Sequence, residues 1–225
     1  MKYLRYFTRA IRQPIIFGRI STTPISNDFG LSRGTPIDRY YIESFLKENE
    51  IDIKGTALEI AENTYTRQFG CGVTSFEVLH INTSNRKATI IGDLTQPKTL
   101  PEKIADCFIC TQTLNFIYDI RRAVEGCLRL LNDGGVFLGT VSGISQISRY
   151  DMDRWGDYWR FTDLSLKKLF SETFQEGNIT IRTFGNVFAA NAFLQGLALE
   201  DIEDKSLLDV NDPNYQITLG IRAVR

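Results

Sequence analysis

The sequence predicts an α/β fold in which one sheet carries helices on both faces. Short apolar segments of strand character alternate along the chain with segments of helical periodicity, the order that such sheets require. The 225 residues, 43% of them hydrophobic and 24% charged, are enough for one domain with a substantial core. Polar side chains follow several of the predicted strands, where α/β sheets bind their ligands.

The first predicted helix lies in the stretch TPIDRYYIESFLKEN. We expect Thr35 to be its N-cap, Pro36 to take the first helical position, and Asp38 to occupy the capping-box site. The helix then presents one apolar stripe to the core, formed by Ile37, Tyr41, Ile42, Phe45 and Leu46.

Strands and a second helix follow in the middle of the chain. Four strands are predicted at Thr56–Ile60, Thr74–Ile81, Ala88–Gly92 and Cys107–Thr111. The stretch DIRRAVEGCLRLLNDGG predicts a helix, because apolar residues recur at helical spacing at Ala123, Val124, Cys127, Leu128 and Leu131. We expect Gly134 and Gly135 to stop this helix and Val136–Val141 to form a fifth strand.

The last third of the chain continues the alternation. A helix that begins near Asp163 would bury Leu166, Leu169 and Phe170. Two more strands are predicted at Ile179–Gly185 and Tyr215–Val224, with a buried helix between them at Val187–Ile202. The expected organisation is a partly helical N-terminal extension over residues 1–34 and a single domain over 35–225, since no repeat or linker interrupts the pattern.

Charge and hydropathy argue against several classes of partner. The net charge of −1 gives no basis for nucleic-acid binding, and the apolar runs are far shorter than the roughly 20 residues of a transmembrane helix. The basic N-terminus has no long apolar core and is not a secretory signal, so we expect a cytoplasmic protein. Leu4, Phe7 and Ile11 predict a short helix packed on its own domain, with a peripheral membrane or partner contact as the alternative.

Two of the four cysteines, Cys107 and Cys110, are spaced like a redox or zinc pair. They lie in a predicted strand, where side chains three positions apart point to opposite faces, so they cannot jointly bind a metal or form a bridge. No cluster of His, Asp and Glu has metal-ligand spacing. We therefore expect buried, reduced thiols and no metal site.

Four polar residues stand at the predicted carboxyl ends of strands: Glu59, His80, Asp93 and Gln112. These ends share one edge of a parallel sheet, so we expect the four side chains to surround one ligand site. The alternative for Glu59 and Asp93 is that they are ordinary strand-end carboxylates. A dinucleotide oxidoreductase is disfavoured, because it requires G-x-G-x-x-G after the first strand and this sequence has no glycine there.

The stretches ALEIAENTYTRQFG, ATIIGDL and FICTQTLNFIYDIRRAVEGCLRLLNDGGVFLGTVSG resemble the class I S-adenosylmethionine-dependent methyltransferases. The resemblance extends from about Thr35 to Phe174. It implies a Rossmann-like, mostly parallel sheet with an antiparallel last strand, and S-adenosylmethionine as cofactor. The stretches SRGTPIDRYYIESFL, GDL and ISQISRYDMDRWGDYWRFT look more narrowly like a bacterial branch associated with glycan or cell-surface polysaccharide synthesis.

This resemblance implies cofactor contacts at five places. The turn after the first strand would lie against the methionine part, the end of strand two against the ribose, and the residues after strand three against adenine. The residues after strand four would line the pocket near the sulfonium, and the start of the first helix would close over the cofactor. In that order the residues are Glu59, Ala61, Glu62 and Asn63, then His80, then Asp93 and Leu94, then Thr111, Gln112 and Thr113, and finally Thr35 and Arg39.

The sequence departs from the family pattern twice. Ala61 stands where the first glycine of the loop is expected, and His80 stands where a ribose-binding carboxylate is expected. Alanine is tolerated unless the backbone needs a positive φ angle. A histidine ring nitrogen can still form a hydrogen bond with a ribose hydroxyl.

The segment ISQISRYDMDRWGDYWRFTD after the fifth strand contains both tryptophans and many charged residues. Aromatic faces and charged groups suit a polyhydroxylated acceptor. Methylation of a hydroxyl generally benefits from a base. The alternative is a loop held together by aromatic packing and internal Arg–Asp pairs. The acceptor-binding candidates are Arg149, Arg154, Trp155 and Tyr158, and the catalytic candidates are Tyr150 with Asp151 or Asp153 as the base.

The predicted function is therefore S-adenosylmethionine-dependent methylation of a small-molecule or glycan acceptor, with oxygen as the favoured atom. The alternative from another class is a catalytically silent, methyltransferase-like protein that binds or scaffolds in glycan assembly. Loss of the loop glycine and of the ribose carboxylate keeps this alternative open.

Overall fold

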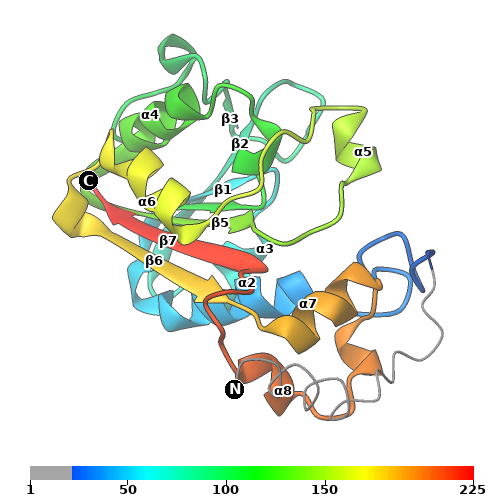
Figure 1. The fold of residues 1–225 in the computed structure, drawn as a ribbon. Coiled ribbons are helices and arrows are strands. Elements are labelled where there is room, and N and C mark those ends of the chain that lie inside the picture. Colours follow the sequence, from blue (N-terminus) through cyan, green and yellow to red (C-terminus); the bar gives the residue numbers. More distant parts are fainter. Residues whose placement is uncertain (1–21) are drawn as a thin grey trace, which may run out of the picture.

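The computed structural model describes residues 22–225 and contains one seven-stranded sheet with helices on both faces (Figure 1). The strands are β1 (Gly55–Ile60), β2 (Val73–His80), β3 (Ile90–Ile91), β4 (Ala105–Thr111), β5 (Leu131–Ser142), β6 (Ile179–Phe184) and β7 (Thr218–Val224). The helices are α2 (Ile37–Glu48), α3 (Thr64–Phe69), α4 (Ile120–Leu130), α5 (Arg149–Met152), α6 (Asp163–Ser171), α7 (Val187–Leu194) and α8 (Ser206–Asp209). The helix predicted around Leu4, Phe7 and Ile11 lies outside the described residues.

The strand order is β3-β2-β1-β4-β5-β7-β6. Neighbours from β3 to β5 pair in parallel, whereas β7 runs antiparallel to both β5 and β6. The register is continuous through the centre, where Phe108 of β4 pairs with Leu58 of β1 and with Phe137 of β5. The predicted fold, mostly parallel with an antiparallel last strand, is confirmed.

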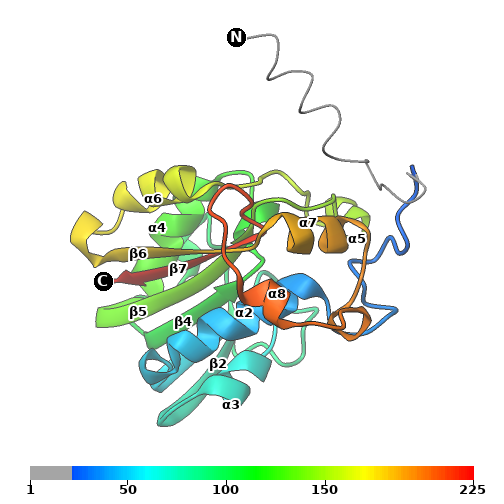
Figure 2. The same ribbon diagram turned by 60° about the horizontal axis from the view of Figure 1, so that its bottom comes forward.

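Each face of the sheet has its own hydrophobic core. Helices α4 and α6 cover one face and contribute Val124 and Leu166 to its core, while α2 and α7 cover the other and contribute Phe45 and Phe193 (Figure 2). Cys110 belongs to the α4 and α6 side and Cys107 to the opposite side, because the two point to different faces of β4. As predicted, they do not form a pair, and burial raises the pKa of Cys107.

The apolar stripe of α2 is buried as predicted, but its N-terminus begins one residue later than expected. Pro36 is the N-cap and makes no side-chain capping bond. The backbone N–H and the hydroxyl of Thr35 donate instead to Glu200, at 2.7 and 2.9 Å. Thr35 therefore fastens the start of α2 to the segment after α7 rather than capping the helix.

Three predicted boundaries are wrong. The α4 helix ends at Leu130, well before Gly134, because Leu131 is extended and pairs with Ala105 of β4. The predicted helix Val187–Ile202 is helical only as α7, Val187–Leu194, and Gly196 with a φ of +68° follows its end. The strand predicted at Ala88–Gly92 has only the two residues of β3.

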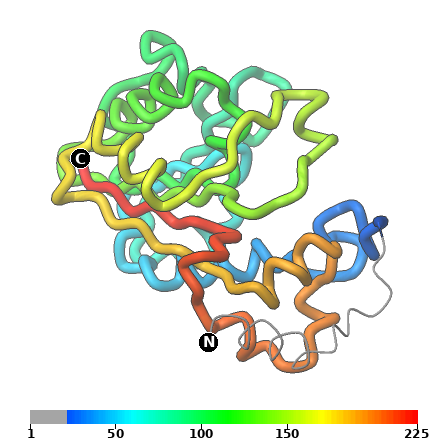
Figure 3. The backbone as a smooth tube through the Cα atoms, in the orientation of Figure 1, coloured from blue at the N-terminus to red at the C-terminus, as the bar shows by residue number. Residues whose placement is uncertain are grey.

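The carboxyl ends of the five parallel strands, β1 to β5, are followed by the segments that form the site. After β5 the chain makes a long excursion that carries α5 before it returns to α6 (Figure 3). The α6 helix begins as predicted, with Thr162 as N-cap in a capping box with Ser165. Within residues 22–225, no helix is both long enough and apolar enough to span a membrane.

Candidate active site

Two cavities lie at the carboxyl ends of the strands and share three lining residues, Gln112, Phe116 and Asp151. We call them the large cavity, of about 600 Å³, and the polar cavity, of about 350 Å³. Both volumes are within the range of small-molecule sites. The arrangement therefore offers room for two ligands that meet at the shared residues.

The large cavity is lined mainly by apolar and aromatic side chains. They come from the ends of β1 and β2, from the segments after β3 and β4, and from the segment around α5. Trp155 and Tyr158 stand at this cavity and do not line the polar one. The lining is formed by Ile60, Ala61, Leu79, His80, Ile81, Gly92, Asp93, Leu94, Thr95, Gln112, Thr113, Phe116, Ile117, Tyr118, Asp119, Asp151, Trp155 and Tyr158.

Asp93 follows β3 and lines the large cavity with its neighbour Leu94, which is buried. Its Oδ1 accepts hydrogen bonds from the backbone N–H and the hydroxyl of Thr95, both at 2.8 Å. Its Oδ2 accepts one from Gln96 at 3.1 Å. Because a carboxylate offers about four acceptor positions, Asp93 can still accept a bond from a ligand.

His80 ends β2 and also lines the large cavity. Its Nδ1 lies 2.9 Å from the carbonyl oxygen of Asn82, and the indole of Trp155 meets its ring edge-on at a centroid distance of 6.3 Å. The tautomer that carries the proton on Nδ1 donates to Asn82 and keeps Nε2 as an acceptor. A hydroxyl group is the kind of ligand that such a nitrogen can bind.

Ala61 begins the turn after β1 with a φ angle of +65°. This left-handed conformation favours glycine and costs an alanine roughly 1–2 kcal/mol. The amide of Asn85 donates to the Ala61 carbonyl oxygen at 2.6 Å and helps to hold the turn. The sequence analysis identified a positive φ as the case in which alanine is unfavourable at position 61. The structure has this positive φ, and the chain nevertheless adopts the turn.

Glu59, predicted as a cofactor contact, lines neither cavity and is 3% exposed. Its carboxylate accepts hydrogen bonds from the N–H groups of Tyr65 and Thr66 and from the Thr66 hydroxyl. Burial raises the pKa of Glu59, and the bonds from Thr66 and Tyr65 oppose that rise. Glu59 thus satisfies two of the free N–H groups in the first turn of α3.

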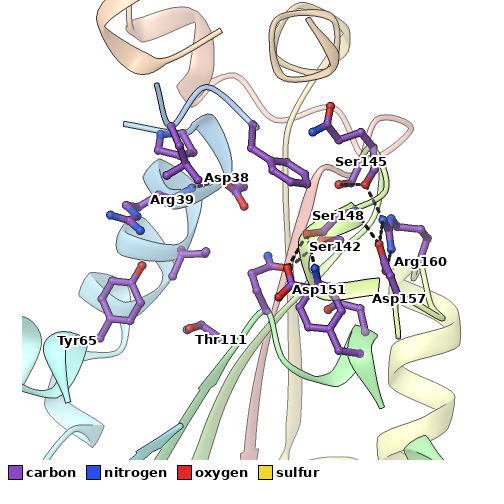
Figure 4. Close-up of a pocket in the computed structure, with 18 of the residues that line it drawn as sticks. Asp38, Arg39, Tyr65, Thr111, Ser142, Ser145, Ser148, Asp151, Asp157 and Arg160 are labelled. Atoms are coloured by element: carbon purple, nitrogen blue, oxygen red, sulfur yellow. Dashed lines mark hydrogen bonds and ion pairs between the residues drawn. The ribbon is translucent and has the colours of Figure 1, made fainter. Parts of the chain in front are cut away.

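The polar cavity lies between two walls (Figure 4). One, which we call the serine wall, begins at the last residue of β5 and consists of Ser142, Ser145, Ser148, Asp157 and Arg160. The other, which we call the helix wall, is formed by α2, α3 and the turn before α3 and consists of Asp38, Arg39, Glu62 and Tyr65.

The serine wall is bonded internally. Arg160 pairs with Asp157 through two bonds of 2.6 and 2.9 Å and also donates to the carbonyl oxygens of Gln146 and Trp159. Asp157 also accepts from the Ser148 backbone N–H at 3.0 Å, and its side chain is only 1% exposed. Burial alone would raise the pKa of Asp157, but the bonds from Arg160 and Ser148 keep it below its ordinary value.

The remaining hydroxyls of the serine wall also have partners. Ser142 donates to Gln112 Oε1 at 2.8 Å, and Ser145 donates to the Gln146 carbonyl oxygen at 2.9 Å. Ser148 donates to Asp151 Oδ2 at 2.6 Å. Gln112, at the junction of the two cavities, has a φ angle of +44°, a strained conformation of the kind that gathers at functional sites.

The helix wall carries polar groups with unused bonding capacity. The carboxylate of Asp38 accepts a bond from the Arg39 N–H at 2.8 Å through Oδ1, and Oδ2 has no partner among the described residues. Burial raises the pKa of Asp38 to about 6, against the opposing effect of Arg39. Burial likewise raises the pKa of Tyr65 to about 12, so its hydroxyl stays neutral.

Asn115, in the turn after β4, also lines the polar cavity and is 2% exposed. Its backbone oxygen accepts bonds from Tyr158 and Trp159, but its side-chain oxygen has no hydrogen-bond partner among residues 22–225. A buried polar atom without a partner costs about 1–3 kcal/mol. Such an atom at a cavity is a candidate ligand contact.

Several predicted site residues lie outside both cavities. Arg154 packs its guanidinium over the Tyr150 ring at 3.5 Å, and Arg149 donates to Met152. Neither these residues nor Asp153 line a cavity. The alternative expectation for this segment, aromatic packing with internal Arg–Asp pairs, therefore describes much of it, and Asp151 is the member that lies at both cavities.

The other predicted cofactor contacts divide between the two cavities. Thr113 lines the large cavity, whereas Arg39, Glu62 and Thr111 line the polar one. Asn63 is the N-cap residue of α3, accepts a bond from Arg67, and lines neither.

Sequence reasoning missed Asp38, Tyr65 and Asn115 as site residues. Asp38 looked like a capping residue, and Asn115 lies in a turn whose burial the sequence does not reveal. Among the described residues no group of His, Cys, Asp and Glu is suited to a metal ion, and all four cysteines are free. Cys71 is exposed, which corrects the expectation that every thiol is buried.

Residues 28–139 match the family model of a methyltransferase domain. Among solved structures, a SAM-dependent methyltransferase from Archaeoglobus fulgidus has a TM-score of 0.52 and 13% identity, over 83% of this chain and 94% of that one. A putative sarcosine dimethylglycine methyltransferase from Galdieria sulphuraria has a TM-score of 0.52 and 13% identity, over 84% and 88%. The N-methyltransferase NodS from Bradyrhizobium japonicum, in complex with S-adenosyl-L-homocysteine, has a TM-score of 0.50 and 13% identity, over 89% and 93%. No curated protein matches the sequence.

The matched domain and the fold agree with each other and with the resemblance seen in the sequence. At 13% identity the solved structures establish the fold alone, while the family match covers the stretch from before α2 to the middle of β5. By its matched domain and its fold, the chain is a class I S-adenosylmethionine-dependent methyltransferase, and S-adenosylmethionine is its cofactor.

Proposed function

We propose that the chain methylates a hydroxyl group of a small polyhydroxylated acceptor, such as a sugar unit of a glycan precursor. In this proposal S-adenosylmethionine occupies the large cavity and the acceptor occupies the polar cavity. The observation that carries it is the junction of the two cavities at Gln112, Phe116 and Asp151, next to the buried and unpaired side-chain oxygen of Asn115. A methyl group can pass between two ligands only where their sites meet.

The residues of the large cavity fit the cofactor. Apolar side chains such as Leu94 suit an adenine ring, Asp93 keeps an acceptor position for its amino group, and His80 can accept from a ribose hydroxyl. When bound, S-adenosylmethionine supplies a methyl group on a positively charged sulfur, open to in-line attack. The chain then has to hold the acceptor in line and exclude water.

The polar cavity supports a polyhydroxylated acceptor. Asn115 and the helix wall offer donors and acceptors that the protein itself leaves unused, which a ligand rich in hydroxyls would satisfy. Carboxylates outnumber cations in the lining of the polar cavity. Of its two arginines, Arg160 is committed to Asp157, and Arg39 has no ion pair among the described residues. A carboxylate or phosphate at the reacting end of the acceptor is therefore disfavoured.

The proposal is tested in two steps, the first being isothermal titration with S-adenosylmethionine and S-adenosylhomocysteine. We expect binding, and we expect Asp93→Ala to weaken it about tenfold, through loss of a charge-assisted bond, while the fold stays intact. Absence of binding at millimolar cofactor by folded protein would instead support the catalytically silent alternative. The observation that favours this alternative is the strained alanine at position 61.

In the second step the protein is incubated with methyl-labelled S-adenosylmethionine and a mixture of monosaccharides, amino sugars and their nucleotide-linked forms. The expected result is S-adenosylhomocysteine above the level without acceptor, together with a product whose label lies on oxygen. No product from any of these acceptors, in protein that binds the cofactor, would overturn the proposed acceptor class.

A further inference from the structure

The carboxylate of Asp38 is a partly buried and only partly bonded charge at the polar cavity. It stands in the first turn of α2, half-buried, with one oxygen bonded only to the Arg39 N–H and the other without a partner in the described part of the chain. Figure 4 shows it across the cavity from Asp151 and Ser148. A carboxylate removed from water without full pairing lowers the stability of a protein, so its presence calls for a reason.

The charged and titratable groups that face Asp38 come from several elements. Arg39 lies on the same helix, Glu62 and Tyr65 come from the turn before α3 and from α3, and Asp151 comes from α5. The Asp157–Arg160 pair stands on the serine wall and is closed on itself. Of these groups only Arg39 is a cation without an ion pair among the described residues. Its charge partly offsets that of Asp38, and no cation on the facing elements adds to this effect.

On the basis of the proposed function, we propose that Asp38 is the catalytic base, which takes the proton of the acceptor hydroxyl as the methyl group is transferred. The acceptor oxygen forms its bond to the methyl carbon while the carbon–sulfur bond breaks and its electron pair remains on sulfur. The hydroxyl proton passes to the free oxygen of Asp38. The negative charge of Asp38 and the positive charge of the sulfur are both neutralised, so the step balances.

The environment of Asp38 distinguishes it from the other carboxylates that are candidates for the base. Glu62 is exposed, and Asp153 lines neither cavity. One carboxylate oxygen of Asp151 accepts a hydrogen bond from the Ser148 hydroxyl, as part of the N-terminal cap of α5. A base works best when its pKa lies near the working pH, and burial brings that of Asp38 to about 6.

The alternative role for Asp38 is structural, since a carboxylate in the first turn of a helix interacts favourably with the helix dipole. The two roles predict opposite effects on stability. A raised pKa means that the folded protein binds a proton more tightly than the unfolded chain, so stability falls as the pH rises from about 4 to about 6. Above that window the charged Asp38 weakens the fold if it is the uncompensated base.

The first test compares the parent with Asp38→Asn, which keeps an acceptor for the Arg39 N–H but cannot be charged. We expect the Tm of Asp38→Asn at pH 7.5 to equal or exceed that of the parent, and the difference to vanish at about pH 4. The control is Glu43→Gln, a carboxylate of the same helix that lines neither cavity. A lower Tm for Asp38→Asn at pH 7.5 would make Asp38 a helix-stabilising residue and overturn the proposal, with or without a known acceptor.

The second test measures S-adenosylhomocysteine formation from the acceptor mixture described above. We expect kcat/KM of the parent to fall below about pH 6, and Asp38→Asn to reduce turnover at least a hundredfold and to lose that acid limb. Affinity for S-adenosylhomocysteine should stay within threefold of the parent. The proposal would be overturned if Asp38→Asn kept the turnover of the parent, or if the hundredfold loss occurred in Asp151→Asn and not in Asp38→Asn. A product methylated on nitrogen would also overturn it.

Failure of this proposal and failure of the proposed function give different results. If the parent binds the cofactor but methylates nothing in the mixture, the acceptor class is wrong and the Tm comparison still decides the state of Asp38. If the parent forms an oxygen-methylated product and Asp38→Asn does so equally well, the function stands and the base lies elsewhere.

Discussion

The two walls of the polar cavity face each other but differ in how their polar groups are used. On the serine wall Arg160, Asp157 and Ser148 bond to one another and to the backbone. On the helix wall Asp38 keeps a free carboxylate oxygen, and Arg39 has no ion pair among the described residues. The segment after β5, whose sequence suggested the most functional residues, thus uses most of its polar groups in bonds within the protein. The helix α2, which looks in sequence like a simple amphipathic helix, carries the groups that can bind a ligand.

The largest effect is expected from breaking the Arg160–Asp157 pair on the serine wall. Arg160→Met leaves the buried Asp157 carboxylate without its cation and with only the bond from the Ser148 N–H. We expect a loss of about 3 kcal/mol in the free energy of unfolding, measured by urea denaturation. The pKa of Asp157 in the folded protein is lower than its ordinary value of 3.8. The pair therefore stabilises the parent fully at pH values above 3.8, and this stabilisation is lost as the pH falls through the lower folded pKa. An unchanged unfolding midpoint would contradict the structural role of the serine wall.

The next effect concerns Asn115, which lines the polar cavity and belongs to neither wall as defined above. Asn115→Leu removes the unpaired buried oxygen, so we expect unchanged or increased stability together with at least a tenfold rise in the KM for the acceptor. Thr140→Val is the matched control, because the Thr140 hydroxyl is also buried without a partner in the described chain but lines neither cavity. Equal kinetic effects in the two variants would refute a ligand contact at Asn115.

A smaller effect is expected at Ala61, which lines the large cavity and belongs to neither wall. Ala61→Gly relieves roughly 1–2 kcal/mol of left-handed strain and adds about 0.5–1 kcal/mol of chain entropy cost, so a net gain of about 0.5 kcal/mol is expected. Thermal unfolding measures the gain, and titration with S-adenosylhomocysteine shows whether the cofactor binds as well as in the parent or better. A destabilised variant would show that the turn is not strained.

The smallest change in stability is expected on the helix wall itself. Arg39→Met removes an exposed guanidinium that has no ion pair among the described residues, so the free energy of unfolding should stay within about 0.5 kcal/mol of the parent. Together with Arg160→Met, it compares one arginine from each wall by the same urea denaturation. Similar losses from both variants would remove the distinction between the walls.

Much of the fold follows from local patterns in the sequence. The apolar stripe of α2, the cap of α6 and the alternation of strands and helices are set by spacing that neighbouring residues determine among themselves. The opposite burial of Cys107 and Cys110 also follows from the two-residue period of a strand. Where boundaries were wrong, as at the end of α4, pairing of Leu131 with Ala105 in the sheet overrode helical spacing.

The site was predicted in part. Sequence order placed His80, Asp93 and Gln112 at the carboxyl edge of the sheet, and all three line a cavity there. Their cofactor contacts, like the extent of the domain over residues 35–225, stay predictions. Glu59 was placed at the same edge, but its carboxylate faces the start of α3 rather than either cavity.

By itself the sequence determined the order of the elements, the edge of the sheet that carries the site, and the residues of the turn in which Ala61 replaces glycine. Only the tertiary structure decided that Ala61 takes a positive φ and that the charges after β5 pair with one another. It also decided that Asp38 and Asn115 keep unused bonding capacity at a cavity. The physical reason is that spacing fixes which face of an element a side chain occupies, whereas hydrogen-bond partners are set by residues far apart in the chain.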